Sequence, residues 1–189
     1  MMDIKGFIME LWGEQWLAQW IGIAATLISF IGYFSKSSHR IFFFQILTNG
    51  IWAVHLTMIH AYPAAAMNVC GFVRSLFLFW GEEKPWARSL AAEIGITLLM
   101  AASGIGAWII GGSSSYAWVP ALPLVAMVVG TVLLWTRKDK VVRYTQFFII
   151  SPLWLVHNYL VVSVGGVLCE LLNMLSVGIA ILKYKKTET

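Results

Sequence analysis

Charged residues are scarce in this sequence. Only 12% of its 189 residues are Asp, Glu, Lys or Arg, whereas 59% are hydrophobic and the mean hydropathy is +0.77. Soluble domains carry roughly a quarter charged residues, and a soluble domain of this size could not bury so much apolar surface. The composition therefore excludes an ordinary soluble domain and favours an integral membrane protein.

Cysteine and the common catalytic motifs are also scarce. The two cysteines, Cys70 and Cys169, lie within apolar runs and do not form a disulfide framework. Neither they nor the histidines have metal-ligand spacing. The sequence contains no Walker A motif, no dinucleotide-binding glycine pattern and no HExxH motif. We therefore expect a protein that is not an enzyme, with no cofactor and no metal site, and that does not hydrolyse a nucleotide.

Long hydrophobic runs account for most of the chain. A transmembrane helix needs about 20 consecutive apolar residues, and seven runs approach that length, separated by short connections rich in turn-forming residues. We expect an all-α, polytopic membrane protein with spans near residues 16–34, 41–59, 62–79, 87–110, 117–135, 142–161 and 164–182.

An internal repeat organises these spans. Trp52-Ala-Val-His55 recurs as Trp154-Leu-Val-His157, and 154 minus 52 is an offset of 102 residues. The fourth span has no counterpart at that offset. Three spans, one linker span and three spans would give parallel repeats related by an axis along the membrane normal. The predicted units are an interfacial N-terminal segment (1–15), a first repeat (16–82), a linker helix (83–112), a second repeat (113–183) and a cytoplasmic tail (184–189).

The basic residues predict the orientation. Eleven of the 13 Lys and Arg residues lie in alternate connections or after the last span, which puts them all on one side of the membrane: Lys36, Arg40, Lys84, Arg88, Arg137, Lys138, Lys140, Arg143, Lys183, Lys185 and Lys186. Cytoplasmic loops carry such an excess. We expect the N-terminus outside and the C-terminus in the cytoplasm, and we interpret the net charge of +4 as a topology signal, with no nucleic acid as a partner.

Polar residues within the spans are the candidate functional residues. Such groups are costly in a bilayer and usually face protein or a water-filled cavity. At similar depths, His55 could face Asn68 in the first repeat and His157 could face Glu170 in the second, where one proton could be shared. The alternative is that these pairs only hold helices together. The predicted solute-binding set is His55, Asn68, His157, Glu170, Asn173, Trp52, Trp154 and Asn49.

Two further features lie in the spans. Arg74 and Glu93 have similar predicted depths on consecutive helices, so they could form a structural ion pair with the linker helix. The alternative is that Arg74 extends its guanidinium to the lipid headgroups. Pro152 frees a backbone carbonyl and could kink the sixth span.

The predicted layout resembles known transporters. Two three-helix units joined by one helix, with a Trp-x-x-His pair in each, are similar to the SWEET, PQ-loop and PnuC group. From about Trp16 to Lys185 the chain looks like the YgjV-type bacterial inner-membrane proteins (Imp-YgjV). The resemblance implies a multi-pass protein of the bacterial inner (plasma) membrane. It also implies a central cavity lined by the third helix of each unit, where Asn68 and Asn173 are the candidates for contacting the solute and Glu170 matches Asn68.

Two classes of function follow from these observations, with an intramembrane enzyme as a distant third. The first is a facilitator or secondary transporter of a small polar solute, with the proton as a candidate second substrate. The second is a non-transporting structural or regulatory membrane protein whose polar residues only connect helices. The expected partners are the lipid bilayer and the solute, and a homo-oligomer is compatible with either class. The two classes differ in whether the polar residues line one water-accessible cavity.

Overall fold

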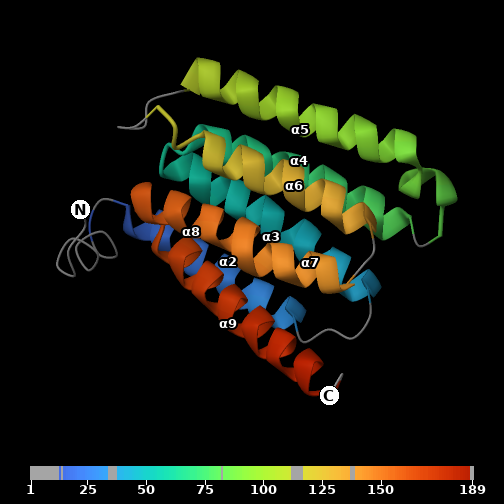
Figure 1. Cartoon of the computed structure of the whole chain (residues 1–189). Helices are drawn as coiled ribbons and strands as arrows, with labels where there is room; N and C mark the ends of the chain where they lie inside the picture. The colour runs from blue at the N-terminus through green and yellow to red at the C-terminus, as the bar shows by residue number, and fades with distance from the viewer. Residues whose placement is uncertain are drawn as a thin grey trace.

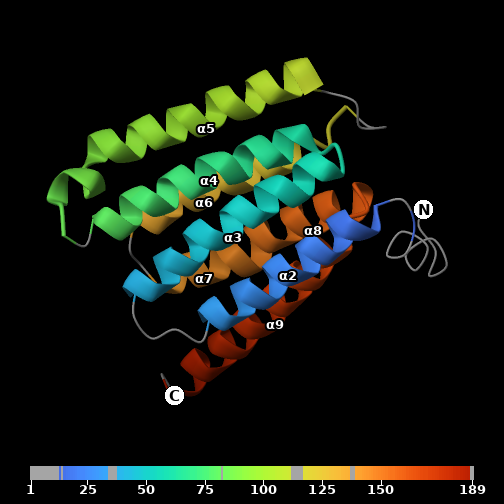
Figure 2. The same cartoon turned by 180° about the vertical axis from the view of Figure 1, so that it is seen from behind.

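The computed structural model describes residues 13, 15–33, 38–81, 83–111, 117–136 and 139–187, and within these ranges it is helical and contains no strand. The hydrophobic runs form helices that pass back and forth side by side (Figures 1 and 2). In chain order they are α2 (Trp16–Tyr33), α3 (Ser38–Met58), α4 (Tyr62–Trp80), α5 (Leu90–Gly111), α6 (Ala121–Thr136), α7 (Asp139–Thr145), α8 (Ser151–Leu160) and α9 (Val164–Thr187), with short turns η1 (Pro85–Arg88) and η2 (Gln146–Ile150).

Within the described residues, the helices match the predicted spans in number when α7, η2 and α8 are taken as one continuous helix. Among the described residues, α3, α4 and α5 contain windows that are long and apolar enough to cross a membrane, and shorter apolar helices occupy Trp16–Gly32, Ala121–Leu133 and Val164–Ile179. The fold is thus all-helical with membrane-spanning segments. The predicted interfacial segment 1–15 lies outside the described residues except for positions 13 and 15.

Proline explains where three of the helices begin. Pro63 lies in the first turn of α4, where its missing N–H is not needed. Pro85 begins the 3-10 turn η1, and α5 therefore starts at Leu90 and not at Ala87, as the hydrophobic run suggested. The run that begins at Ala117 forms a turn through Pro120 before α6 starts at Ala121.

A π-helical turn interrupts the continuous helix formed by α7, η2 and α8. Residues Gln146–Ile150 form η2 directly before Ser151 and Pro152, and the Ser151 N–H donates to the carbonyl of Gln146, five residues earlier. Pro152 has no N–H to offer the preceding turn, and its ring would clash with the carbonyl four residues before it in a regular α-helix. A π turn relieves both problems, and such turns occur frequently at functional sites.

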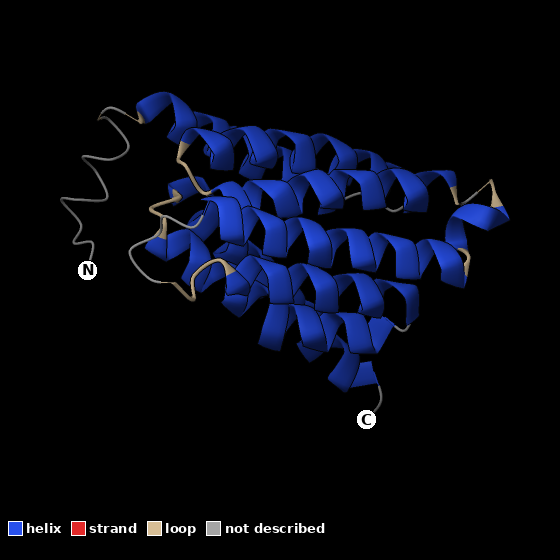
Figure 3. Ribbon diagram, turned by 90° about the horizontal axis from the view of Figure 1, so that it is seen from above, coloured by secondary structure: helices blue, strands red, loops and turns tan. Residues whose placement is uncertain are grey.

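The packing places two groups of helices face to face. Helix α3 lies between α2 and α4, and α8 lies between α6 and α9. The groups meet at two seams, because α2 packs against α9 and α4 packs against α6. Helix α5 covers α4 and α6 from outside, at the edge of the bundle (Figure 1). Figure 3 shows the helices side by side from above. The core holds small and flexible side chains, with Ala64, Met67 and Met100 fully buried.

Two hairpin turns lie at one end of the bundle, which we call the hairpin end: the α3–α4 turn (Ile59–Ala61) and the α8–α9 turn (Val161–Ser163). Each contains a residue with left-handed backbone, His60 at φ 62° and Val162 at φ 57°. The three N–H groups of the first turn donate to His55, Thr57 and Leu56, and those of the second donate to His157, Tyr159 and Asn158. Every pair of matching residues in these turns is 102 positions apart in the sequence, the offset of the internal repeat.

Candidate solute cavity

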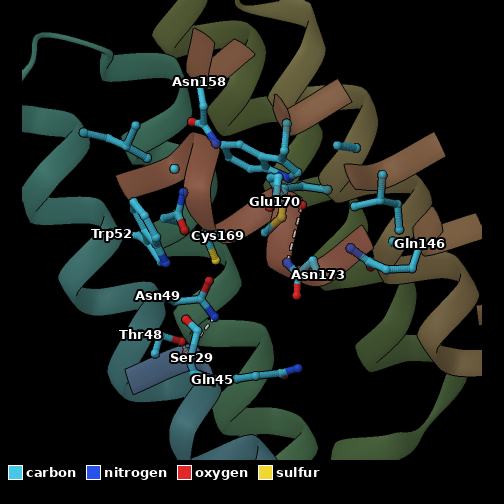
Figure 4. A pocket seen from close by; sticks show the side chains of 18 of the residues that line it. Ser29, Gln45, Thr48, Asn49, Trp52, Gln146, Asn158, Cys169, Glu170 and Asn173 are labelled. Atoms are coloured by element: carbon cyan, nitrogen blue, oxygen red, sulfur yellow. Dashed lines mark hydrogen bonds between the residues drawn. The ribbon is translucent and has the colours of Figure 1, made fainter. Parts of the chain in front are cut away.

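A cavity of about 330 Å³ lies between the two groups of helices. Its wall is built from one face of each of α3, α4, α6, α8 and α9, with further side chains from α2 and η2. The polar lining residues are Ser29, Gln45, Thr48, Asn49, Asn68, Arg74, Gln146, Asn158, Glu170 and Asn173. Trp52 and Trp154 add large flat surfaces to this wall. Figure 4 shows most of these side chains directed into one space.

Six of the eight predicted solute-binding residues line this cavity: Asn49, Trp52, Asn68, Trp154, Glu170 and Asn173. They come from α3, α4, α8 and α9, so the fold brings together residues from both copies of the repeat. The two histidines, His55 and His157, are buried beside the cavity and are not part of its lining.

His55 holds helices together and does not face Asn68. One ring nitrogen, Nδ1, lies 2.7 Å from the carbonyl oxygen of Ala18 on α2, and the other, Nε2, lies 2.7 Å from the hydroxyl of Ser163 before α9. The Asn68 amide instead donates to Ala64 on its own helix at 3.0 Å. The predicted direction of the imidazole was therefore wrong.

Other hydrogen bonds reinforce the place where His55 meets α9. Gln19 donates to the carbonyl of Val162 at 2.8 Å and accepts from the Val164 N–H at 2.9 Å. Thr26 donates to the carbonyl of Gly165 at 2.8 Å. We call the set Gln19, Thr26, His55, Ser163 and Gly165 the α2–α9 clasp. Gly165 lies so close to Gly22 that an added methyl group would come within 2.6 Å of the Gly22 carbonyl oxygen.

His157 does not pair with Glu170 either. Its Nδ1 lies 3.4 Å from the amide oxygen of Asn158, and its ring meets Trp154 edge-on with centroids 5.6 Å apart. The Trp52–His55 pair has nearly the same geometry, with centroids 5.4 Å apart. Its neighbour Asn158 lines the cavity (Figure 4).

Glu170 has neutral partners. The Asn173 amide lies 3.4 Å from its Oε2, and the Ser151 side chain also hydrogen-bonds to the carboxyl. Ser151 in turn accepts a hydrogen bond from Gln146 at 3.0 Å. The acid therefore has an amide of α9 and a hydroxyl of α8 as its hydrogen-bond partners.

Arg74 also lines the cavity, and it does not form the predicted pair with Glu93. Its side chain is 7% exposed, and Nη1 donates to the Thr131 hydroxyl of α6 at 3.1 Å. Its Nε has no hydrogen-bond partner among the described residues. Glu93 lies in the first turn of α5 and is half-buried. The guanidinium of Arg74 therefore contacts α6 and the cavity, and it does not contact Glu93.

Five polar lining residues were not predicted: Ser29, Gln45, Thr48, Gln146 and Asn158. Helical periodicity contained a signal for three of them. Gln45 and Thr48 precede Trp52 by seven and four residues, and Asn158 follows Trp154 by four, so each shares a helical face with a predicted residue. Among the described residues, no group of three His, Cys, Asp or Glu side chains could hold a metal ion.

Comparison with known proteins identifies the family of this chain. Residues 16–188 match the family Imp-YgjV, described as bacterial inner membrane protein. The chain belongs to this family. It is also 24% identical over 169 residues to the inner membrane protein YgjV of Escherichia coli strain K12, an alignment that covers 89% of this chain and 85% of that protein. No solved structure matches the chain.

Membership of the Imp-YgjV family agrees with the helices described above. The match begins at Trp16, where α2 begins, and ends one residue after α9. It therefore includes every helix that contributes to the cavity wall and to the α2–α9 clasp. The protein is an integral protein of the bacterial inner membrane.

Proposed function

We propose that this protein is a facilitator or secondary transporter of a small polar solute, which passes through the cavity between two parallel three-helix repeats. The observation that carries the proposal is the lining of the cavity. A purely structural bundle has no need of a space of about 330 Å³ lined by ten polar side chains, because polar groups at membrane depth are costly unless they face partners or water. Binding pockets typically begin at about this size.

The contacts between helices support the proposed repeats. Under the 102-residue offset, α2, α3 and α4 correspond to α6, α8 and α9. The α2–α9 seam then corresponds to the α6–α4 seam, which is the reciprocity expected of a two-fold axis. The matching hairpin turns and the matching Trp–His pairs support the same relation. Arg40 lies in the first turn of α3, which runs toward the hairpin end, and Lys84 follows the far end of α4. Both therefore lie opposite the hairpin end, which supports an outside N-terminus and a cytoplasmic C-terminus.

Glu170 is the residue on which we expect transport to depend most. It is an acid where the first repeat has the neutral Asn68, and a charge at mid-helix costs about 2.5–3.5 kcal/mol. The groups that touch its carboxyl, Asn173 and Ser151, are neutral, and His157 lies elsewhere. A carboxyl that takes up and releases a proton while a solute binds beside it would couple the two movements.

The test begins with the purified protein in detergent. Solutes are screened for thermal stabilisation, since a ligand that binds the folded state raises its stability by mass action. Solutes that stabilise are then measured for uptake into proteoliposomes. Glu170→Gln should keep the same elution profile and melting behaviour but lose uptake or its dependence on pH, while Arg40→Gln, at an exposed site outside the cavity, should retain both. Normal uptake by Glu170→Gln across the pH range would show that the acid is structural.

One observation favours the second candidate function, a non-transporting membrane protein. Both histidines are packed beside the cavity, and His55 connects three helices. This second function would be supported if no solute stabilises the protein and none enters proteoliposomes that contain it. The polar residues would then only connect helices.

A further inference from the structure

The cavity contains one cationic and one anionic residue among the lining side chains that the structure describes, Arg74 and Glu170. Neither forms an ion pair with another described residue. The guanidinium donates to the neutral Thr131 hydroxyl, and the carboxyl has Asn173 and Ser151 as partners. Two opposite charges therefore face one space without neutralising partners in contact.

Unpaired charges at this depth need compensation. A buried ion is strongly unfavourable unless it is paired and fully hydrogen-bonded, and Arg74 is 93% buried with its Nε unsatisfied. A neutral sugar would offer both groups only uncharged hydrogen bonds. A simple anion would leave the negative charge of Glu170 uncompensated, and a simple cation would leave the positive charge of Arg74 uncompensated. A solute with an anionic group and a cationic group compensates both.

We infer that the solute is a small zwitterion, whose carboxylate binds Arg74 and whose ammonium group binds Glu170. This inference rests on the proposed transport function and names the class of solute for the same cavity. Arg74 suits a carboxylate because the planar guanidinium presents two parallel donors. Asn173 and Ser151 beside Glu170 provide further polar contacts for an ammonium group. The volume of about 330 Å³ restricts the solute to roughly the size of an amino acid.

The position of the two charges indicates that the ammonium and the carboxylate are well separated in the solute. Arg74 lies six residues beyond Asn68 along α4, which is about 9 Å of helix rise. Under the proposed repeat, Glu170 lies at the depth of Asn68. Because the long arginine side chain can span part of this distance, we expect the best fit for zwitterions with several carbons between the two groups.

Thermal unfolding of the full-length protein in detergent tests this inference. The probes are glycine, 4-aminobutyrate and 6-aminohexanoate as zwitterions of increasing length, butyrate and n-butylamine as singly charged analogues, and glucose as a neutral polar solute. We expect an ω-amino acid to stabilise the protein at lower concentration than either singly charged analogue. Loss of one charge–charge contact should raise the half-saturating concentration about ten- to hundred-fold.

Variants assign the two ends of the solute. Arg74→Gln should abolish the advantage conferred by the carboxylate, and Arg74→Lys, which keeps the charge, should retain part of it. Glu170→Gln should abolish the advantage conferred by the ammonium group. Arg40→Gln, an exposed site at the start of α3, is the matched control and should bind like the unmodified protein.

The outcomes separate the two proposals. If glucose stabilises as well as the zwitterions, and Arg74→Gln binds it unchanged, the zwitterion inference is wrong while a solute cavity stands. If n-butylamine binds as tightly as 4-aminobutyrate, Arg74 does not receive a carboxylate and the inference is again wrong. If no probe stabilises the protein, the zwitterion inference is wrong, and the proposed transport function is then decided by the wider solute screen and the uptake measurements.

Discussion

Replacing Gly165 by Ala should separate α2 from α9 and destabilise the protein severely. The new methyl group would lie 2.6 Å from the carbonyl oxygen of Gly22 and 2.7 Å from the backbone nitrogen of Ile23. Ordinary contacts begin near 3.4 Å, so the backbones must part by nearly 1 Å. Backbone atoms cannot rotate aside as a side chain can, and the whole seam must move.

The cost follows from the bonds that this movement breaks. Overpacking typically costs about 1–3 kcal/mol. The clasp contributes four hydrogen bonds of 2.7–2.9 Å across the seam, made by Gln19, Thr26 and His55. At an average of about 0.6 kcal/mol each in a membrane protein, their weakening adds roughly 2 kcal/mol. We expect a loss of about 3–5 kcal/mol in the free energy of unfolding.

Unfolding in detergent, followed by circular dichroism against temperature or denaturant, measures this loss. Gly106→Ala on α5 is the control, because a methyl group there would meet no atom within 4 Å and Ala favours the helix. Gly178→Ala on α9 should be mild, since its nearest contact is the Phe147 ring at 3.1 Å. Equal stability of Gly165→Ala and Gly106→Ala would refute the tight seam and the role given to the clasp.

Three further predictions concern other parts of the chain. His55→Ala removes two contacts of 2.7 Å and leaves the Ser163 hydroxyl and the Ala18 carbonyl without this partner. It should cost about 2–4 kcal/mol of stability, more than His157→Ala, whose contact with Asn158 is 3.4 Å long; the reverse order in thermal unfolding would contradict the clasp. Val162→Gly should raise the stability by up to about 1 kcal/mol, because a β-branched residue at φ 57° is strained; a lower melting temperature would show that the side chain contributes more than the strain costs. A C-terminal reporter enzyme that is active only in the periplasm should stay inactive in cells, and activity would overturn both the orientation and the parallel repeats.

The sequence predicted the helices well because their signal is local. A bilayer-length hydrophobic run between turn residues leaves few alternatives to a helix, so each of the seven predicted spans contains a helix. The ends were less accurate where proline acts through tertiary structure, as at Pro85, where η1 separates the start of the run from α5. The π turn before Pro152 was expected only as a kink.

The cavity was predicted in part, for a reason visible in α3. Sequence position gives depth along a helix, which brought Asn49, Asn68 and Glu170 to one region. The direction around the axis depends on which neighbour packs where, and His55 turns toward α2 while Trp52, three residues earlier, faces the cavity. The Arg74–Glu93 pairing failed for the same reason, because equal depth on consecutive helices does not make two side chains face each other.

The π turn η2 has a consequence for the divergence of the two proposed repeats. One residue added to an α-helix rotates all residues beyond it by about 100°. In this helix, that rotation would turn the lining residues on one side of the insertion away from the cavity. A π turn accommodates the added residue within itself. Beyond it, Trp154 corresponds to Trp52 at an offset of 102, while before it Gln146 corresponds to Gln45 at 101, and all four residues line the cavity. If the two halves are duplicates, as proposed above, η2 is the turn that would accommodate an inserted residue while both glutamines still line the cavity.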